Sequence, residues 1–427
     1  MQARKKRFLS RLGSVFRREE EGESQPSFFS IIDLGTEYVK TLVVEIKDRK
    51  AHILGYGQAQ YRGSHLGPRA MAAICDRALR QAEDMTEKTF GRLIVPDRAA
   101  FAVPLSWVQG GSYTVEHHRS SPNELIRPKE LEGVLQRVQR LAFQRLRQSL
   151  SADPKETVAL PPILVEARID GHRVTDPIGF RGGVLTLTVF NALTRREALA
   201  ALERIAEELE LEPPLPVLES QALACSLAVP EAIILDIGAH LTAISIAREG
   251  HPVAAGSLAF GGQAFDRQLA SHFRLAPPRA EALKMVYSRG ELNEEMAASV
   301  RHLVAPLVES WLFQVERKLG EIWKQTFPPH IYLCGGVSEL REALLGARDF
   351  SWMSALPFER CPEAHLLTPS DIPHILNRVG PAAGQEGVLA MALASWVAQQ
   401  KDSKEDLPTQ LLYKVTRALT ELEGWRM

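Results

Sequence analysis

The chain alternates short apolar runs with glycine-containing turns, and two of these runs share one pattern. Residues 28–32 form a largely apolar run that predicts a buried strand, and Asp33 and Gly35 follow at its end. Gly35 permits a tight turn in which backbone N–H groups approach an anion, and a second apolar strand follows at 39–46. The same order of apolar run, Asp, hydrophobe and Gly recurs at 233–238, roughly 200 residues later.

Such a strand–Asp–x–Gly hairpin is one way to hold a nucleotide phosphate, because its amides face the phosphate oxygens and its carboxylate can order a metal-bound water. A single copy is weak evidence, since Asp-x-Gly-Thr also occurs in ordinary hairpin turns. Two copies predict two related domains that face each other across a nucleotide. A third apolar run, 331–334, ends in Gly335 and Gly336, whose bare backbone would let an adenine or ribose lie flat.

Composition narrows the class of protein. A chain of 427 residues with 45% apolar residues predicts two or more domains with real cores. The formal net charge is −1, so no overall field favours nucleic acid or a membrane surface. The four cysteines form no Cys-x-x-Cys pair, which indicates a reducing compartment and argues against a disulfide framework or a zinc site. No run of about 18 apolar residues predicts a membrane span, and the N-terminus lacks the apolar core of a signal peptide.

Between 112 and 194 the pattern changes to that of a separate α+β unit. Apolar side chains at helical spacing predict a helix over 128–150 with a basic outer face, and strands are expected at 163–169 and 185–193. We expect the basic face to be solvated, with no nucleic acid as a partner. Residues 262–326 are predicted to be mostly helical. The expected buried stripe of that part comprises Met296, Val300, Leu303, Val304, Leu307 and Trp311.

Both ends of the chain predict amphipathic helices. Within 4–18, five apolar side chains fall in an arc of roughly 120° with most basic residues opposite, as in a helix lying on anionic lipid. These side chains are Phe8, Leu9, Leu12, Val15 and Phe16. The alternative is a disordered basic leader. A second amphipathic helix, over 407–425, follows a charged linker at 401–406. We expect the first helix to be the main membrane anchor and the second to be a further lipid contact, or else to dock onto this protein or a partner.

The runs at 31–40, 233–242 and 331–338, in this order, resemble the first phosphate, second phosphate and adenosine motifs of the actin-like ATPase superfamily. The turn Asp176-Pro177-Ile178-Gly179-Phe180-Arg181-Gly182, followed by Leu185, resembles the inserted subdomain of the FtsA family of bacterial cell-division proteins. Further features of that family occur in the same order: Leu218-Glu219-Ser220-Gln221-Ala222, Phe260-Gly261-Gly262, Ala280-Glu281-Ala282-Leu283-Lys284 and Gly335-Gly336-Val337. The resemblance covers roughly residues 28–398.

This resemblance implies an α/β chain with the actin-like two-domain ATPase fold, built from duplicated ribonuclease-H-like cores, with an inserted α+β subdomain in place of an actin subdomain. The expected first core comprises 27–111, 195–230 and 380–400, and the second comprises 231–261 and 327–379. The other expected parts are the inserted subdomain at 112–194, a helical subdomain over the nucleotide at 262–326, and the tails at 1–26 and 401–427.

The resemblance also implies a role for each matched residue at an ATP–Mg²⁺ site. Asp33 and Asp236 would position the metal through waters, and Glu219 would orient an attacking water, which makes Glu219 and Asp236 the expected catalytic residues. The expected cofactor-binding residues are Asp33, Gly35, Thr36, Lys40, Gly238, Gly261, Gly262, Glu281, Lys284, Gly335, Gly336 and Val337. Some alternatives stay open: Lys40 can point to solvent, Glu219 can be a helix-start glutamate without function, and Glu281 with Lys284 can be a surface ion pair.

The second phosphate loop departs from the FtsA pattern, which is typically Asp-x-Gly-Gly-Gly-Thr. Here Ala239, His240 and Leu241 follow Gly238, and their β-carbons restrict φ and keep the backbone farther from a phosphate. We therefore expect slow ATP hydrolysis at most, with nucleotide acting mainly as a conformational ligand. The glycine-poor loop also resembles PilM, the actin-like protein of type IV pilus assembly, although that relative lacks the turn at 176–182.

The FtsA resemblance implies a protein that binds ATP, self-assembles through its inserted subdomain and links FtsZ filaments to the cytoplasmic face of the cell membrane at the division site. Other division proteins are further implied partners. One alternative is a PilM-like adaptor that binds a peptide of a membrane pilus protein. Another is a sugar-kinase-type enzyme on the same fold, which would need a carboxylate base beside a sugar pocket, and no motif supplies one.

Overall fold

The computed structural model describes residues 27–61, 66–149, 156–379, 384–400 and 407–422. The proposed membrane-binding residues Phe8, Leu9, Leu12, Val15 and Phe16 lie outside the described residues, as does the linker at 401–406. No helix in the described part of the chain is both long enough and apolar enough to cross a membrane.

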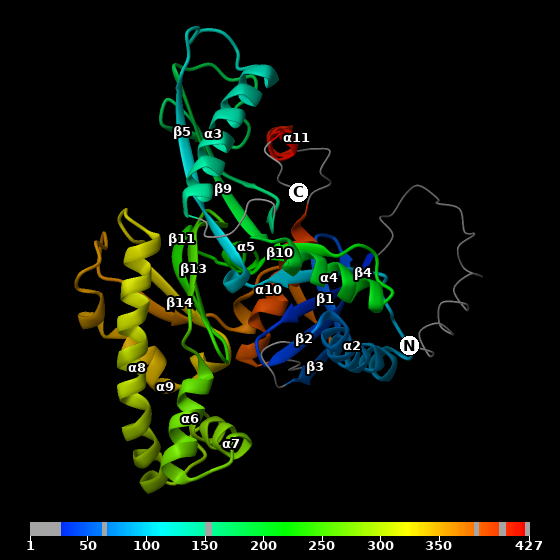
Figure 1. Ribbon diagram of the computed structural model, residues 1–427, viewed down its shortest axis with the longest axis vertical. Coiled ribbons are helices and arrows are strands. Elements are labelled where there is room, and N and C mark those ends of the chain that lie inside the picture. Colours follow the sequence, from blue (N-terminus) through cyan, green and yellow to red (C-terminus); the bar gives the residue numbers. More distant parts are fainter. Residues whose placement is uncertain (1–26, 62–65, 150–155, 380–383, 401–406, 423–427) are drawn as a thin grey trace.

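The first core is a six-stranded sheet with the strand order β10-β4-β1-β2-β3-β16. Its strands are β1 (Ser27–Leu34), β2 (Tyr38–Lys47), β3 (Lys50–Gln60), β4 (Arg98–Val103), β10 (Leu215–Leu218) and β16 (Ile375–Asn377). Its helices are α2 (Pro68–Phe90), α4 (Arg196–Glu208), α5 (Glu219–Ala224) and α10 (Val388–Gln399). Side chains alternate along β1, so Ile32 packs into the cluster of α2 and α4, whereas Ile31 packs into that of α5 and α10. The sheet is therefore covered on both faces (Figure 1).

The second core repeats this plan. Its strands are β11 (Glu231–Ile237), β12 (Thr242–Arg248), β13 (His251–Leu258), β14 (His330–Cys334) and β15 (Glu363–Leu366). As in the first core, the Asp–x–Gly motif lies at the turn of an antiparallel hairpin, here β11–β12. A later strand, β14, lies parallel to the first strand of the hairpin, as β4 does in the first core. Its helices are α6 (Gly262–Phe273), α7 (Pro277–Ser288), α8 (Glu294–Ile322) and α9 (Arg341–Arg348).

The buried stripe predicted for α8 is confirmed at three positions, is only partly buried at Leu303 and Leu307, and is wrong at Met296. Val300, Val304 and Trp311 of α8 are buried. Met296 is 37% exposed because it lies in the first turn of α8, where its backbone amide is capped by the Asn293 side chain.

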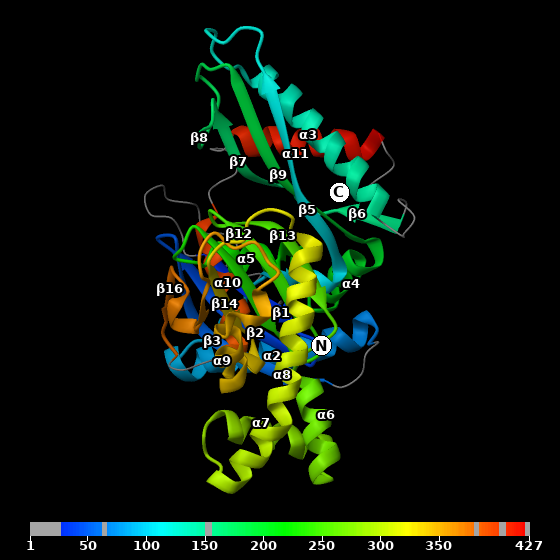
Figure 2. The same cartoon turned by 90° about the vertical axis from the view of Figure 1, so that its left-hand side faces the viewer.

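An α+β subdomain extends from the second core at the end opposite α6 and α7 (Figures 1 and 2). It consists of β5 (Val108–His118), α3 (Pro128–Ser149), β6 (Thr157–Ala159), β7 (Ile163–Ile169), β8 (His172–Val174) and β9 (Val184–Arg195). Its sheet is continuous with that of the second core, because Gly111 of β5 pairs with Ala254 of β13.

The turn at 176–182 is hydrogen-bonded to the segment that precedes α3. Gly179 has a φ of +84°, and its amide and the Phe180 carbonyl bond to the Ile126 backbone. A β-carbon on Gly182 would collide with the Ile169 side chain. Gly179 therefore meets a requirement of backbone conformation, and Gly182 meets a packing requirement of the subdomain.

The C-terminal helix α11 (Leu407–Leu422) docks onto this subdomain (Figure 2). Its apolar side chains Leu411, Leu412, Val415 and Leu419 are buried in the core of the subdomain. Gln139 of α3 donates a buried hydrogen bond of 2.9 Å to the Thr416 hydroxyl. The sequence left open whether this helix contacts lipid or docks onto protein, and in the structure it docks onto this protein. Its apolar face, which was expected to contact lipid, is covered by the subdomain.

Candidate functional site

A cavity of about 340 Å³ lies where the β1–β2 turn of the first core faces the β11–β12 turn of the second. Its volume falls within the range of small-molecule sites, about 300–1,000 Å³. Predicted residues that line it are Asp33, Gly35, Thr36, Lys40, Glu219, Asp236, Gly238, Gly262, Glu281, Lys284, Gly335, Gly336 and Val337. Gly261 lies behind the second loop, where a β-carbon would sit 2.6 Å from the Gly238 carbonyl oxygen. The fold thus brings nearly all the predicted residues to one place.

Lys40 points into this cavity and not to solvent. The antiparallel register of β1 and β2 sets Lys40 opposite Asp33, and its Nζ lies 3.1 Å from the Asp33 carboxylate. Burial by itself lowers the pKa of Lys40, but the charges of Asp33 and Asp236 outweigh that effect, so its pKa is raised. Lys40 is therefore a fixed positive charge between the two carboxylates.

Glu219 is buried and Asp236 is half-buried, and both carboxyl groups have raised pKa values. Burial raises the pKa of Glu219 to about 8, with a further increase from the charge of Asp236, although the Leu105 amide opposes it by donating a hydrogen bond of 2.8 Å. Burial raises the pKa of Asp236 to about 6, and Lys40 partly offsets this. Three acidic groups thus share one lysine. This oxygen-rich set fits a hard dication such as Mg²⁺, which prefers carboxylate and water ligands.

The two phosphate-type loops touch each other across the cavity. The His240 amide donates to the Thr36 hydroxyl at 3.2 Å. The Gly238 amide donates to the Leu241 carbonyl within its own loop, at 2.9 Å. The Gly238 carbonyl in turn accepts from the Gly262 amide at the start of α6. The amide that the sequence assigned to a phosphate oxygen at Gly238 is therefore already bonded, and a phosphate would have to replace that bond.

The third motif supplies open backbone beside the carboxylates. Gly335 has a φ of +84°, and a β-carbon there would collide with the Asp236 carboxylate and lie 2.6 Å from the Ile237 carbonyl oxygen. A β-carbon on Gly336 would meet nothing within 4 Å. Gly335 is thus required by the fold, whereas Gly336 leaves free space towards a ligand.

Glu281 and Lys284 bond to other residues across the cavity wall. Lys284 Nζ lies 2.7 Å from Asp266 of α6, and the Tyr38 hydroxyl donates to Glu281 at 2.9 Å. The residues predicted from sequence did not include Tyr38 and Asp266, although both line the cavity. A signal for Asp266 was present, because it lies one helical turn after Gly262 and shares a face with it.

Comparisons with known proteins place this architecture. No protein-family model matches the chain, and no curated protein matches its sequence. A chain of the PilM–PilN type IV pilus biogenesis complex is similar over 87% of this chain and 98% of that chain, with 17% identity and a TM-score of 0.60. The ethanolamine utilization protein EutJ from Carboxydothermus hydrogenoformans has 15% identity over 88% and 92% of the two chains, with a TM-score of 0.48. MreB 5 of Spiroplasma citri, bound to AMPPNP, has 13% identity over 87% and 95%, with a TM-score of 0.40.

The chain therefore has the actin-like ATPase fold, as the sequence predicted. At identities of 13–17%, these likenesses show the fold alone. None of the comparisons selects FtsA over PilM or another member of this fold class.

Proposed function

We propose that this chain is an actin-fold adaptor that binds ATP–Mg²⁺ in the cleft and uses the nucleotide to set its conformation. The observation that carries the proposal is the cleft itself: two copies of one phosphate-type hairpin face each other around Asp33, Asp236, Glu219 and Lys40. Such a set of buried and half-buried ionisable groups costs free energy in an ordinary core, so it indicates a ligand.

Each group has a task that its position supports. Mg²⁺, when bound, would neutralise phosphate charge, with Asp33 and Asp236 holding its water ligands. Lys40 lies beside both carboxylates and keeps their repulsion low before the metal enters. Gly336 leaves room for the adenosine, and Gly335 allows the backbone to pass close to Asp236. These residues bind and orient a nucleotide without further chemistry.

Hydrolysis is proposed to be slow at most. The second loop has Ala239, His240 and Leu241 where glycines would allow close wrapping, and the Gly238 and His240 amides already donate hydrogen bonds. Glu219 is mostly protonated at neutral pH, because its pKa is about 8, and a protonated carboxyl group is a poor base for an attacking water. Assembly and tethering therefore suit this chain better than turnover does.

The first candidate role is FtsA-like: tethering FtsZ to the cytoplasmic face of the cell membrane at the division site, with self-assembly through the inserted subdomain. The turn at 176–182 supports it, together with the amphipathic pattern of residues 4–18. The second candidate role is that of a PilM-like adaptor in type IV pilus assembly. The extent of the likeness to the PilM–PilN complex chain favours it, since the match spans 98% of that chain.

Calorimetry with ATP and Mg²⁺ tests the proposal, comparing the intact chain with Asp33→Ala and Gly336→Trp. Micromolar binding by the intact chain that Gly336→Trp abolishes would support the cleft as the site. An intact chain that binds no nucleotide would make the protein a nucleotide-free scaffold and refute the proposal.

Pull-down with FtsZ and, separately, with a peptide of a membrane pilus protein then discriminates the two roles. Sugar-dependent production of ADP would instead indicate a kinase.

A further inference from the structure

Three side chains with metal-binding atoms meet at the edge of the second core, away from the cleft. His330 begins β14 and Glu363 begins β15, the edge strand of the ten-stranded sheet. The strands are parallel, and their register sets His330 directly beside Glu363. Because side chains alternate along a strand, His365 shares the face of Glu363, while Ala364 is buried on the other face. Two strands that are distant in sequence therefore create this cluster.

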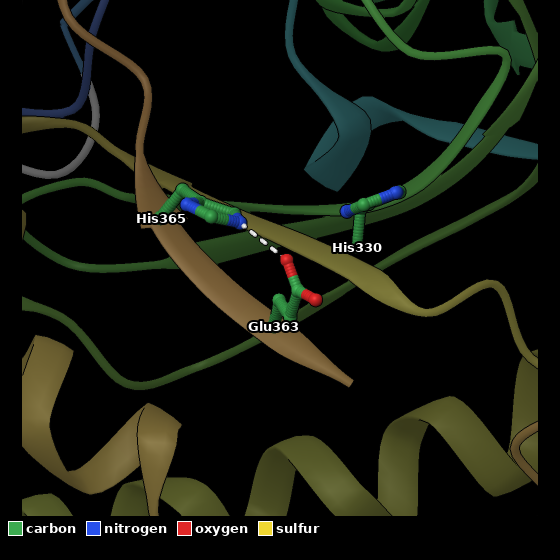
Figure 3. Close-up of side chains that lie close together, drawn as sticks. All are labelled: His330, Glu363 and His365. Atoms are coloured by element: carbon green, nitrogen blue, oxygen red, sulfur yellow. Dashed lines mark ion pairs between the residues drawn. The ribbon is translucent and has the colours of Figure 1, made fainter. Parts of the chain in front are cut away.

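The three side chains lie close together, with the His365 ring directed at the Glu363 carboxylate (Figure 3). His365 Nε2 lies 3.6 Å from the Glu363 carboxylate, and the two imidazole centroids are 6.2 Å apart. One ligand atom from each residue lies within 4.8 Å of the other two. Nδ1 of His330 is buried and has no hydrogen-bond partner among the described residues. A buried nitrogen without a partner is uncommon and points to a missing ligand.

We propose that His330, Glu363 and His365 bind a divalent first-row transition metal, with Zn²⁺ as the ion that fits best. Two imidazoles and one carboxylate are a known donor set for Zn²⁺, with the fourth position open to water. Zn²⁺ bonds of about 2.0–2.2 Å place two ligands of a tetrahedral ion roughly 3.4 Å apart. The 3.6 Å between His365 and Glu363 is already close to this value, so a side-chain rotation of His330 completes the set.

This site differs in kind from the cleft. The cleft offers carboxylates, which suit Mg²⁺, whereas imidazole nitrogens select Zn²⁺ and its neighbours. An ion here would cross-link the edge strand β15 to β14, and β14 leads directly into Gly335 of the cleft. Metal binding would thus stiffen the strand that carries the adenosine loop.

Arg360 lies beside the cluster and should oppose metal binding. Its guanidinium lies 3.4 Å from Nε2 of His330, and the side chain is exposed. A guanidinium keeps its charge and repels a dication, so it must turn into solvent when the metal binds. Because a guanidinium only donates, Nε2 of His330 is the acceptor in this contact and Nδ1 carries the ring proton. An ion at Nδ1 displaces that proton, and the proton on Nε2 in the metal-bound tautomer ends the contact with Arg360.

Calorimetric titration of the metal-stripped full-length chain with Zn²⁺ tests the proposal. A Cys361→Ser background removes an exposed thiol near the cluster, and excess Mg²⁺ occupies carboxylate sites. We expect one Zn²⁺ per chain, at least about tenfold weaker binding in His365→Ala and in Glu363→Gln, and tighter binding in Arg360→Ala. The matched control His302→Ala removes an exposed histidine of α8 and should change nothing.

Co²⁺ provides a second measurement, because its visible absorption distinguishes a tetrahedral protein site from the hydrated ion. The proposal is overturned if the chain binds no stoichiometric Zn²⁺, or if the double variant His365→Ala/Glu363→Gln binds it as well as the parent. Loss of Zn²⁺ binding on Asp236→Asn alone would also overturn it, since the ion would then belong to the cleft. The site stands independently of nucleotide binding, so a chain that fails to bind ATP leaves this test intact.

Discussion

Replacing Glu219 with glutamine removes a buried titrating group while keeping its shape. Glutamine retains a carbonyl oxygen for the Leu105 amide, which lies 2.8 Å from the glutamate in the native chain. The variant therefore changes charge and proton binding with little change in packing.

The expected effect follows from the raised pKa. Glu219 has a pKa of about 8 in the folded chain against an ordinary value of 4.5, so between these values the folded state holds a proton that the unfolded state has released. Stability supplied by this group is thus present below pH 4.5 and is lost as pH rises towards 8. At about 1.4 kcal/mol per pKa unit, the loss reaches roughly 5 kcal/mol as an upper limit. Asp236, with a pKa of about 6, adds a loss of the same sign at lower pH.

Urea denaturation of the nucleotide-free chain in EDTA, at pH 5, 6, 7 and 8, measures this effect. Glu219→Gln should match the native midpoint near pH 5 and exceed it clearly at pH 8. Glu116→Gln, which removes an exposed carboxylate of β5, is the matched control and should follow the native curve. If native and Glu219→Gln midpoints fall in parallel from pH 6 to 8, Glu219 does not hold a proton in the folded cleft and the reasoning is wrong.

Three further predictions concern the cleft and α11. Binding of ATP–Mg²⁺ should release protons at pH 7, because a dication favours ionised carboxylates, and calorimetry in buffers of different ionisation enthalpy should show the release fall in Glu219→Gln. Gly335→Ala should weaken nucleotide binding at least about tenfold and cost about 1–3 kcal/mol of stability, because its φ of 84° with a ψ of 164° is a conformation that glycine adopts almost exclusively. Gly336→Ala should bind within a few-fold of native, and equal effects of the two variants would contradict the assigned geometry. Leu412→Ala should destabilise docking of α11 by about 2–5 kcal/mol, measured by hydrogen exchange of its amides, whereas Lys414→Ala, which breaks only an ion pair with Glu132, should cost under about 1 kcal/mol.

The elements that local pattern determines were predicted well. The helix expected over 128–150 spans Pro128–Ser149, and the strand expected at 163–169 has those bounds. Both segments keep one periodicity throughout, so their apolar faces were visible without tertiary information. The duplicated strand–Asp–x–Gly pattern likewise predicted two similar cores, because each copy needs the same buried strand before its turn.

Contacts between distant segments were not predictable in this way. Residues 407–425 have an apolar face that suits lipid or protein equally, and only the tertiary structure shows that α11 covers α3. The partners of Glu281 and Lys284 are also distant: Tyr38 lies in β2 and Asp266 in α6. The cysteine count argued against a zinc site, yet the transition-metal site proposed here uses histidines from two strands that become neighbours only in the folded sheet.

The sequence by itself determined the class of fold and most of the groups at the cleft, because strand periodicity, turn glycines and buried carboxylates are local features. Only the tertiary structure decided which of those groups remain available. The Gly238 and His240 amides are already bonded, Lys40 is held by Asp33, and the C-terminal helix is docked. The physical reason is that a hydrogen bond or an apolar contact forms only with a group that the fold brings within a few ångströms. Pairings between residues hundreds of positions apart leave no periodic pattern in the sequence.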